Sequence, residues 1–361
     1  MSDSPSTYSA ANIKVLEWPE AIRKRPGMYV GSTSQRGLHQ LVYEVLDRPV
    51  NAVLAGRATR VDVTLMADGR IRVEDDGPGD GGGLGLEGPM THVRAGVRRR
   101  DRRTVDLSYV GAPVANALSS ELTAEVRRDG VRWVQEYERG ISLAPPSPAG
   151  PATASGTTLV FRPDADLFET VECSFDDLLD RFRELAFLNR DLTLTLTDER
   201  PRGGAEPRQE HCRFPGGARD FVEFLAAGAD NPVHTDILHF EWEDPRLAGT
   251  VEVALRWSEG PGAGVRSFAN SARTPEGGTH VNGFLDGVAA ALGLPEATDH
   301  GLTAVVSVKL DDPEFEGATR GLLGGEGVRD GVAEAVRGHL AACLAAHPER
   351  AGAVVRRLSG P

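Results

Sequence analysis

Residues 37–56 read GLHQLVYEVLDRPVNAVLAG, and this stretch decides the fold. We read it as a helix that presents Glu44 and, one turn later, Arg48. A guanidinium carries only hydrogen-bond donors and a fixed positive charge, so Arg48 cannot ligate a hard cation that needs oxygen. Taken alone, Glu44 reads as a solvated carboxylate on a helix face, and only the flanking pattern can give it a role.

Two short strands follow this helix. Residues 61–65 (VDVTL) alternate at period two, as a strand with one buried face should. Residues 71–79 (IRVEDDGPG) read as a second strand that runs into a glycine turn. Asp75 and Asp76 have a simple interpretation at this point, because Asp and Gly favour turns without any ligand.

Motifs before and within these elements resemble the DNA gyrase B family of the GHKL ATPase superfamily. Residues 13–16 (IKVL) and 21–31 (AIRKRPGMYVG) resemble its N-terminal signature, and residues 37–56 resemble its nucleotide-site helix. The resemblance implies an α+β fold: a GHKL (Bergerat) α/β sandwich, followed by a transducer domain with a left-handed βαβ unit.

In that family the helix presents a glutamate that activates water and an asparagine that holds magnesium. The resemblance therefore assigns the catalytic role to Glu44. Arg48 stands at the position of the asparagine. The magnesium site is thus incomplete, and we identify no metal ligands in the chain.

The resemblance also implies an adenine-side pocket. Asp75 corresponds to the aspartate that accepts a hydrogen bond from the adenine amino group, and Gly79 belongs to the same DDGxG element. Pro78 stands where the family has an arginine. Arg128 and Thr157 fall where the family has an arginine and a threonine near this pocket, although Thr157 is also an ordinary strand residue.

The phosphate loop of the family is a run of glycines at a helix start, where backbone N–H groups bind the triphosphate. The corresponding residues 105–111 read VDLSYVG, and only Gly111 remains of the glycines. Asp106 adds a negative charge beside the expected triphosphate, and such a like-charge contact costs about 4 kcal/mol per unit charge. We therefore expect ATP binding to be weak or lost.

Residues 81–103 correspond to the ATP lid and contain six arginines between positions 94 and 103. These arginines either hold an anionic group, bind nucleic acid locally, or form a solvated charged loop. The sequence leaves these alternatives open.

The second half resembles the transducer domain through residues 216–225, 251–257, 268–271 and 277–280. In the family a glutamine and a lysine on a transducer loop reach the γ-phosphate, and here Ala318 and Arg320 stand at these positions. Arg320 keeps the positive charge but presents a planar fork instead of a point charge.

We expect two domains, a GHKL ATPase-like domain over residues 1–213 and a transducer-like domain over residues 214–361. Residues 144–155, rich in Pro, Ala and Ser, are expected to form a loop inside the first domain. The sequence ends about where the transducer of the family ends, so we expect no DNA cleavage by this chain itself.

Composition limits the remaining function classes. Three widely spaced cysteines argue against a disulfide framework or a zinc site. A net charge of −13 argues against a broad nucleic-acid surface, so any DNA contact must be local. The chain has no signal peptide and no apolar run near the roughly 18 residues of a membrane helix, so we expect a soluble cytoplasmic protein.

Three functions stay open. The first is a gyrase B-like ATPase of the type II topoisomerase family, with Glu44 as base. The second is a pseudo-ATPase scaffold that pairs with itself or with gyrase subunits. The N-terminal arm, including Tyr8, resembles the segment that swaps across the gyrase B dimer, and Tyr8 is counted with the cofactor-binding residues on this basis. The third is a pocket reused for a small molecule, with Glu44, Asp47, Asp75, Arg48 and Tyr109 as polar groups.

Overall fold

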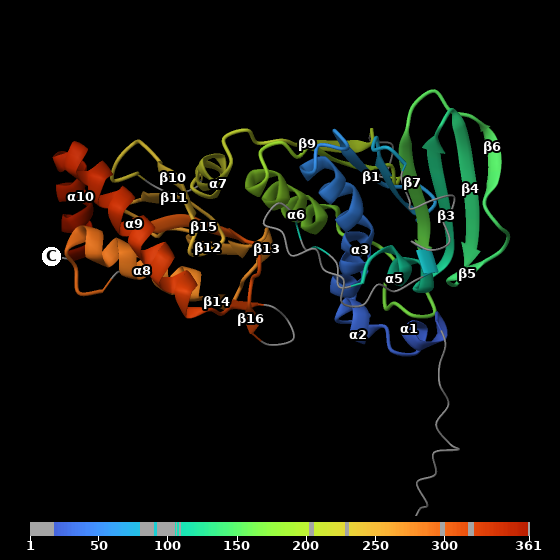
Figure 1. Cartoon of the computed structure of the whole chain (residues 1–361), viewed down its shortest axis with the longest axis horizontal. Helices are drawn as coiled ribbons and strands as arrows, with labels where there is room; N and C mark the ends of the chain where they lie inside the picture. Colours follow the sequence, from blue (N-terminus) through green and yellow to red (C-terminus); the bar gives the residue numbers. More distant parts are fainter. Residues whose placement is uncertain are drawn as a thin grey trace, which may run out of the picture.

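The computed structural model describes residues 18–79, 90–91, 105, 107, 110–201, 206–227, 231–296, 300–316 and 321–359. Two β-sheets, each with helices packed on it, follow one another along the long axis of the molecule (Figure 1). The expected α+β architecture is confirmed.

The first sheet has the strand order β5-β4-β3-β7-β2-β1-β8-β9, with β6 beside β4. Strand β1 pairs antiparallel with β2 and parallel with β8, and β7 pairs antiparallel with β2 and β3. The strands are β1 (Val61–Leu65), β2 (Ile71–Asp75), β3 (Ser119–Arg128), β4 (Val131–Glu138), β5 (Ile141–Ser142), β6 (Ser147–Pro151), β7 (Gly156–Pro163), β8 (Leu194–Asp198) and β9 (Arg208–Cys212). The strands expected at residues 61–65 and 71–75 are therefore confirmed.

Helices cover one face of this sheet (Figure 1). The longest is α3 (Gln35–Leu54), which buries an apolar residue at every third or fourth position from Leu38 to Val53. It packs with α5 (Ala112–Ala117). Helix α6 (Phe175–Leu188) is capped by Ser174, the residue before it, whose side chain accepts a hydrogen bond from the backbone N–H of Asp177. The short helices α1 (Glu20–Lys24) and α2 (Gly27–Val30) precede α3.

Residues 144–155 are not only a loop, and that expectation is wrong for their middle part. Strand β6 lies there, paired antiparallel with β4 at the sheet edge, and all five of its residues are exposed. The prolines of this stretch were the reason to expect a loop. Proline is tolerated on an edge strand because one side of such a strand has no ladder to complete.

The second sheet has the order β10-β11-β15-β12-β13, and a small third sheet has the order β14-β17-β16. Strands β12 and β15 are parallel, with α8 between them in the chain. The bounds are β10 (Leu238–Asp244), β11 (Gly249–Trp257), β12 (Gly264–Ala269), β13 (Ala272–Arg273), β14 (Gly277–Gly278), β15 (Leu302–Leu310), β16 (Phe315–Glu316), β17 (Leu322–Leu323), α7 (Ala218–Leu225), α8 (Thr279–Leu292), α9 (Glu326–Ala346) and α10 (Pro348–Ser359).

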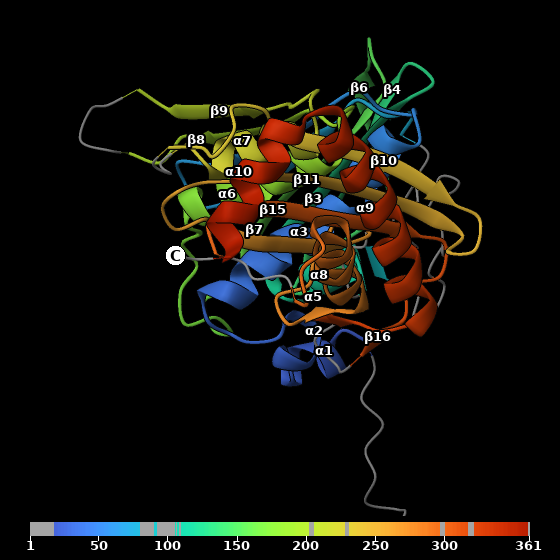
Figure 2. The same ribbon diagram turned by 90° about the vertical axis from the view of Figure 1, so that its left-hand side faces the viewer.

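The period-two alternation of β11 and β15 explains why this sheet is covered on both faces. Val251, Val253 and Leu255 join the apolar core formed with α8 and α9, which lie in front of the sheet in Figure 2. Ala254 and Val305 point to the opposite face, where they pack with α7 and the end of α6. The second sheet therefore serves both its own core and the junction with the first half.

The junction between the two halves combines an aromatic stack with polar bonds. Phe187 of α6 stacks on Phe214 and Phe221, with ring centroids 3.8 and 4.6 Å apart. Beside it, Glu184 accepts from Arg273 Nε of β13 at 2.6 Å, and the Arg190 guanidinium lies 2.6 Å from Glu252 of β11. Among the described residues, no helix is long and apolar enough to span a membrane.

Candidate functional site

The predicted adenine-side residues meet at the ends of β2 and β7. Asp75 and Thr157 are directly opposite each other in the antiparallel register, so their side chains share the face covered by helices. Both are buried, with 8% and 4% of their surface exposed. Thr157 Oγ1 has no hydrogen-bond partner among the described residues, although it is buried.

Asp75 is a buried carboxyl with a mixed environment. Its Oδ1 accepts from the backbone N–H of Gly77 at 2.9 Å. Burial raises the pKa of Asp75 above its usual value, while the Gly77 bond and the positive charge of Arg48 act in the opposite direction. Arg48 of α3 therefore lies near enough to Asp75 to act on its carboxyl, and its side chain is exposed.

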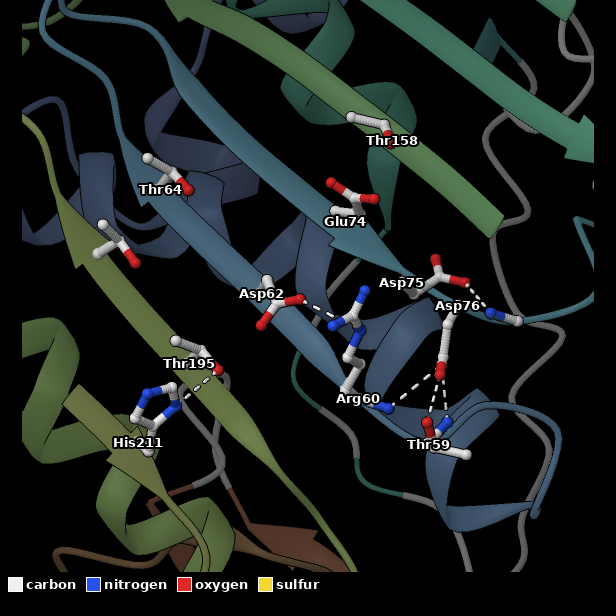
Figure 3. Close-up of polar contacts among 12 residues, drawn as sticks. Thr59, Arg60, Asp62, Thr64, Glu74, Asp75, Asp76, Thr158, Thr195 and His211 are labelled. Carbon is white, nitrogen blue, oxygen red and sulfur yellow. Dashed lines mark hydrogen bonds and ion pairs between the residues drawn. The ribbon is translucent and has the colours of Figure 1, made fainter. Parts of the chain in front are cut away.

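Asp76, the next residue, serves the turn and not the pocket (Figure 3). Its carboxylate accepts from the backbone N–H and the hydroxyl of Thr59 and from the N–H of Arg60. Burial opposes the charged form, but these hydrogen bonds outweigh it and lower the pKa of Asp76. The turn interpretation thus describes Asp76, whereas Asp75 points inward.

Gly79 and Arg128 lie beside this pocket. Gly79 has a φ of +66°, and a Cβ on it would lie 2.7 Å from the Arg127 carbonyl oxygen, so a side chain there would clash with β3. The same Cβ would lie 3.4 Å from Arg128 Cβ, which places Arg128 next to the glycine turn. Arg128 precedes a tight β3–β4 turn in which Asp129 and Gly130 both have positive φ.

Glu44, the expected base, is almost fully buried at 1% exposure. Its Oε2 accepts from the backbone N–H groups of Val110 at 3.0 Å and Gly111 at 2.6 Å, and its Oε1 accepts from Gln40 at 2.9 Å. Gly111, with a φ of +98°, immediately precedes α5. The N–H groups that the resemblance assigns to a triphosphate therefore bind a carboxylate of the protein itself.

Glu44 is one of four polar side chains of α3 that form hydrogen bonds with the backbone of residues 105, 107, 110 and 111. Gln40 donates to the carbonyl of Leu107 at 3.1 Å, and Asp47 accepts from the N–H of Leu107 at 2.9 Å. Asn51 bonds both ways with the backbone of Val105, at 2.9 and 2.8 Å. Because residues 40, 44, 47 and 51 recur every three or four positions, they share one face of the helix. We call these four residues the α3 ladder.

Sequence reasoning missed Gln40 and Asn51. Their signal was their helical spacing with Glu44 and Asp47, a polar stripe beside the apolar one. The spacing alone did not reveal their partners, which lie 54 to 67 positions away in the chain.

The donor set does not suit magnesium. Arg48 has no lone pair to offer, and oxygens of Glu44 and Asp47 already accept backbone N–H groups. The residues fit only the adenine half of ATP. The Thr157 hydroxyl, which has no partner among the described residues, and the Asp75 carboxyl suit a base. On the phosphate side, the Glu44 carboxylate already accepts from the backbone N–H of Val110. Tyr8, Asp106, Tyr109, Arg320 and the arginines of residues 94–103 lie outside the described residues.

Two further hollows lie near the site. A hollow of about 290 Å³ opens at the end of β2 between Asp75, Arg127 and residues 151–155. The sheet face opposite the helices carries a groove of about 460 Å³, whose lining includes Thr64, Thr195 and Thr197. Figure 3 shows Thr64 and Thr195 on this face. No sequence motif had singled out this groove.

Comparison with known proteins gives consistent results. The family model described as DNA gyrase B matches residues 217–293 and 295–359. The DNA gyrase B protein of Streptomyces coelicolor is 38% identical over 98% of this chain, and that of Mycobacterium tuberculosis is 36% identical over 97%. The chain spans 57% and 59% of the length of these two relatives.

Solved structures agree with these relatives. The 43K ATPase domain of Thermus thermophilus gyrase B, solved with an aminocoumarin, superimposes with a TM-score of 0.75 at 31% identity. The match covers 94% of this chain and 93% of that one. The gyrase B protein of Myxococcus xanthus gives a TM-score of 0.74 at 26% identity, covering 94% of this chain and 99% of that one.

Proposed function

Because this chain belongs to the DNA gyrase B family, we propose that it is a gyrase B-type nucleotide module whose ATP hydrolysis is impaired. The proposal comprises two domains, residues 1–213 for the nucleotide and residues 214–361 as transducer. It assigns adenine recognition to Asp75 and Thr157 and leaves Glu44 without its catalytic task.

One observation carries this proposal: Glu44 Oε2 lies 2.6 Å from the Gly111 nitrogen and 3.0 Å from the Val110 nitrogen. A general base must have its lone pairs directed at the attacking water. Here the Glu44 carboxylate is directed at the backbone N–H groups of Val110 and Gly111. The carboxylate is therefore not available to a water molecule, and these N–H groups are not available to a phosphate. To bind a triphosphate, the chain must first separate them.

Arg48 adds a second obstacle to hydrolysis. Phosphoryl transfer relies on a magnesium ion to neutralise charge that develops on the phosphates. A guanidinium supplies positive charge but cannot coordinate this ion. The loss of the metal ligand and the engagement of the base affect different parts of the reaction, so their effects on the rate should multiply.

The experiment is a phosphate-release assay beside an active gyrase B ATPase domain, with and without magnesium. We expect turnover to be at least about 100-fold lower, in line with the contribution of a positioned base. A Glu44→Gln variant purified in the same way sets the background from contaminating ATPases. Turnover within tenfold of the active domain, lost in Glu44→Gln, would refute the proposal.

A scaffold role is a second candidate: the family match over residues 217–293 and 295–359 lies in the half that we propose as transducer, away from Glu44 and Arg48. In this role the chain pairs with itself or with gyrase subunits. Light scattering of the chain alone and with gyrase A or gyrase B tests this. We expect deletion of residues 1–12 to weaken self-association, and an unchanged mass would exclude an arm-mediated dimer.

A further inference from the structure

We propose that the outer edge of β10, together with the indole of Trp242, binds an extended peptide segment whose residues alternate between basic and apolar. Strand β10 is the outermost strand of the second sheet, and Figure 2 shows it beside α9. This surface shares no residue with the nucleotide pocket, so the binding function goes beyond the proposed one.

Strand β10 leaves one of its edges without a partner strand. It pairs along all seven of its residues with β11, and it pairs with no other strand in the described part of the chain. Among the residues that the structure describes, the backbone of residues 238–243 makes backbone hydrogen bonds only with β11. An unpaired edge exposes a row of N–H and C=O groups, to which an extended segment can bind as an additional strand.

The two faces of β10 differ in chemistry. On the face of α9, the Phe240 ring stacks on His339 with ring centroids 4.8 Å apart, and Trp242 meets the same imidazole edge-on at 5.4 Å. Glu241 and Glu243 are exposed on the other face, because successive side chains of a strand alternate. A strand added beside β10 continues both faces, so apolar side chains should lie next to Trp242 and basic ones next to the two glutamates.

Trp242 is exposed and yet held in place. Although its ring packs against His339, 43% of its surface is exposed. Hydrogen bonds from Arg246 and, to a smaller extent, from the Trp242 side chain lower the pKa of Asp244, and Arg246 also donates to Glu334 of α9 at 2.8 Å. A side chain that is already fixed loses little conformational entropy on binding, and tryptophan is enriched among the residues that dominate binding energy.

The charge of this surface favours a basic partner. Glu241 and Glu243 repel nucleic acid and other polyanions. They also disfavour pairing of β10 with the same strand of a second copy, because like charges would then face each other. A cationic side chain is attracted both by the carboxylates and by the indole face of Trp242 when it lies within about 6 Å of the ring.

The test is calorimetric titration of the whole chain with the peptide Arg-Val-Arg-Val-Arg-Val-Arg, called the basic peptide. We expect it to bind at least about tenfold more tightly than the same peptide with Glu in place of Arg, and its affinity should fall as the salt concentration rises. No binding of the basic peptide at millimolar concentration would overturn the inference, and so would equal binding of the acidic peptide.

A modified peptide tests whether the backbone of the ligand is recognised. The basic peptide with N-methylated backbone amides keeps its side chains but cannot donate to a strand ladder, so it should bind at least about tenfold more weakly. Equal affinity of the two peptides would overturn the addition of a strand to β10.

Trp242→Ala tests the aromatic anchor. It should weaken binding of the basic peptide at least about tenfold, as expected for a tryptophan that dominates an interface. Leu143→Ala is the matched control, since it truncates another exposed apolar side chain in the first half of the molecule, and it should leave the affinity unchanged. Equal losses in the two variants would overturn the role of Trp242.

A pair of charge-neutralising changes keeps the inference testable if Trp242→Ala does not fold. Glu241→Gln combined with Glu243→Gln should weaken binding of the basic peptide at least about threefold and reduce its salt dependence. Glu136→Gln combined with Glu138→Gln is the matched control, because these glutamates are exposed at the same spacing on β4. Equal weakening in both would show that net charge alone attracts the peptide, and would overturn the inference.

Discussion

At the scale of single residues, neighbouring residues of the same type lie on opposite faces of the first sheet, because successive side chains of a strand alternate between its two faces. Asp75 and Thr157 face the helices, whereas Asp76 and Thr158 face the other way and bond to Thr59 and Arg127. The resemblance to the DDGxG element assigned Asp75 to the adenine side, which stays a prediction, and the turn interpretation given for both aspartates describes Asp76. Neither pattern could predict the unpartnered hydroxyl of Thr157, because this depends on what surrounds it in space.

His280 leads to a prediction at the same scale. It is fully buried at the start of α8, its Nε2 lies 3.1 Å from Thr274 Oγ1, and burial lowers its pKa from 6.5 to about 4. Between pH 6.5 and about 4, His280 is protonated in the unfolded chain but stays neutral in the folded chain. The free energy of unfolding should therefore fall as the pH drops from 6.5 to about 4, by about 3 kcal/mol in all, and stay unaffected by His280 above 6.5.

Urea unfolding at pH 7.5, 6 and 5 measures this loss. His280→Gln keeps an acceptor for Thr274 but cannot be protonated, so its stability should depend less on pH below 6.5. His347→Gln, a change at a half-exposed histidine, should retain the dependence. An equal acid loss in all three proteins would show that other groups cause it.

At the scale of elements, the α3 ladder binds the backbone of Val105, Leu107, Val110 and Gly111. The resemblance to the nucleotide-site helix of the family predicted this helix, and comparison with the phosphate loop of the family predicted the loss of its glycines. Neither predicted that Gln40, Glu44, Asp47 and Asn51 would bond to the backbone there. Such bonds form only when two stretches that are distant in the sequence come together in the fold. The spacing of residues along one helix does not show which other stretch lies beside it.

Asn51→Ala tests the ladder at its end farthest from Glu44. The change removes both bonds to Val105 and leaves partly buried backbone groups without their partner, so the free energy of unfolding should fall by about 1–2 kcal/mol. Urea unfolding measures the loss. Gln35→Ala is the matched control, because Gln35 lies on the same helix but bonds to the Glu172 carbonyl. Equal effects of the two changes would argue against a ladder.

At the scale of the whole molecule, the helix that carries Glu44 also reaches the junction. Tyr43, the residue before Glu44, is half-buried near the charges of Arg181, Arg273 and Glu184, and the loss of solvent around its hydroxyl raises its pKa to about 12. Arg273 belongs to the second sheet, and Arg181 donates to the carbonyl of Ser271 in the turn before β13. One face of α3 thus bonds to the backbone of Val105, Leu107, Val110 and Gly111, and another carries Tyr43 close enough to the second half to feel the charge of Arg273.

We predict that the two halves unfold together because of the Phe187 stack. Phe187→Ala removes the ring between Phe214 and Phe221 and should cost about 3–5 kcal/mol. It should also split a single calorimetric transition into two. Phe182→Ala is the matched control, since Phe182 is equally buried on the same helix but packs only in the first core. It should lower the transition temperature without splitting it, and two transitions in both variants would refute a special role for Phe187.

The α3 ladder has a consequence for hydrogen exchange at Val105, Leu107, Val110 and Gly111. The N–H groups of Val105, Leu107, Val110 and Gly111 all donate to side chains of one long buried helix. Their hydrogens can exchange with solvent only when these bonds open, so a connecting segment acquires the slow exchange of the helix that holds it. Hydrogen exchange at these four positions would then report the opening of α3 itself.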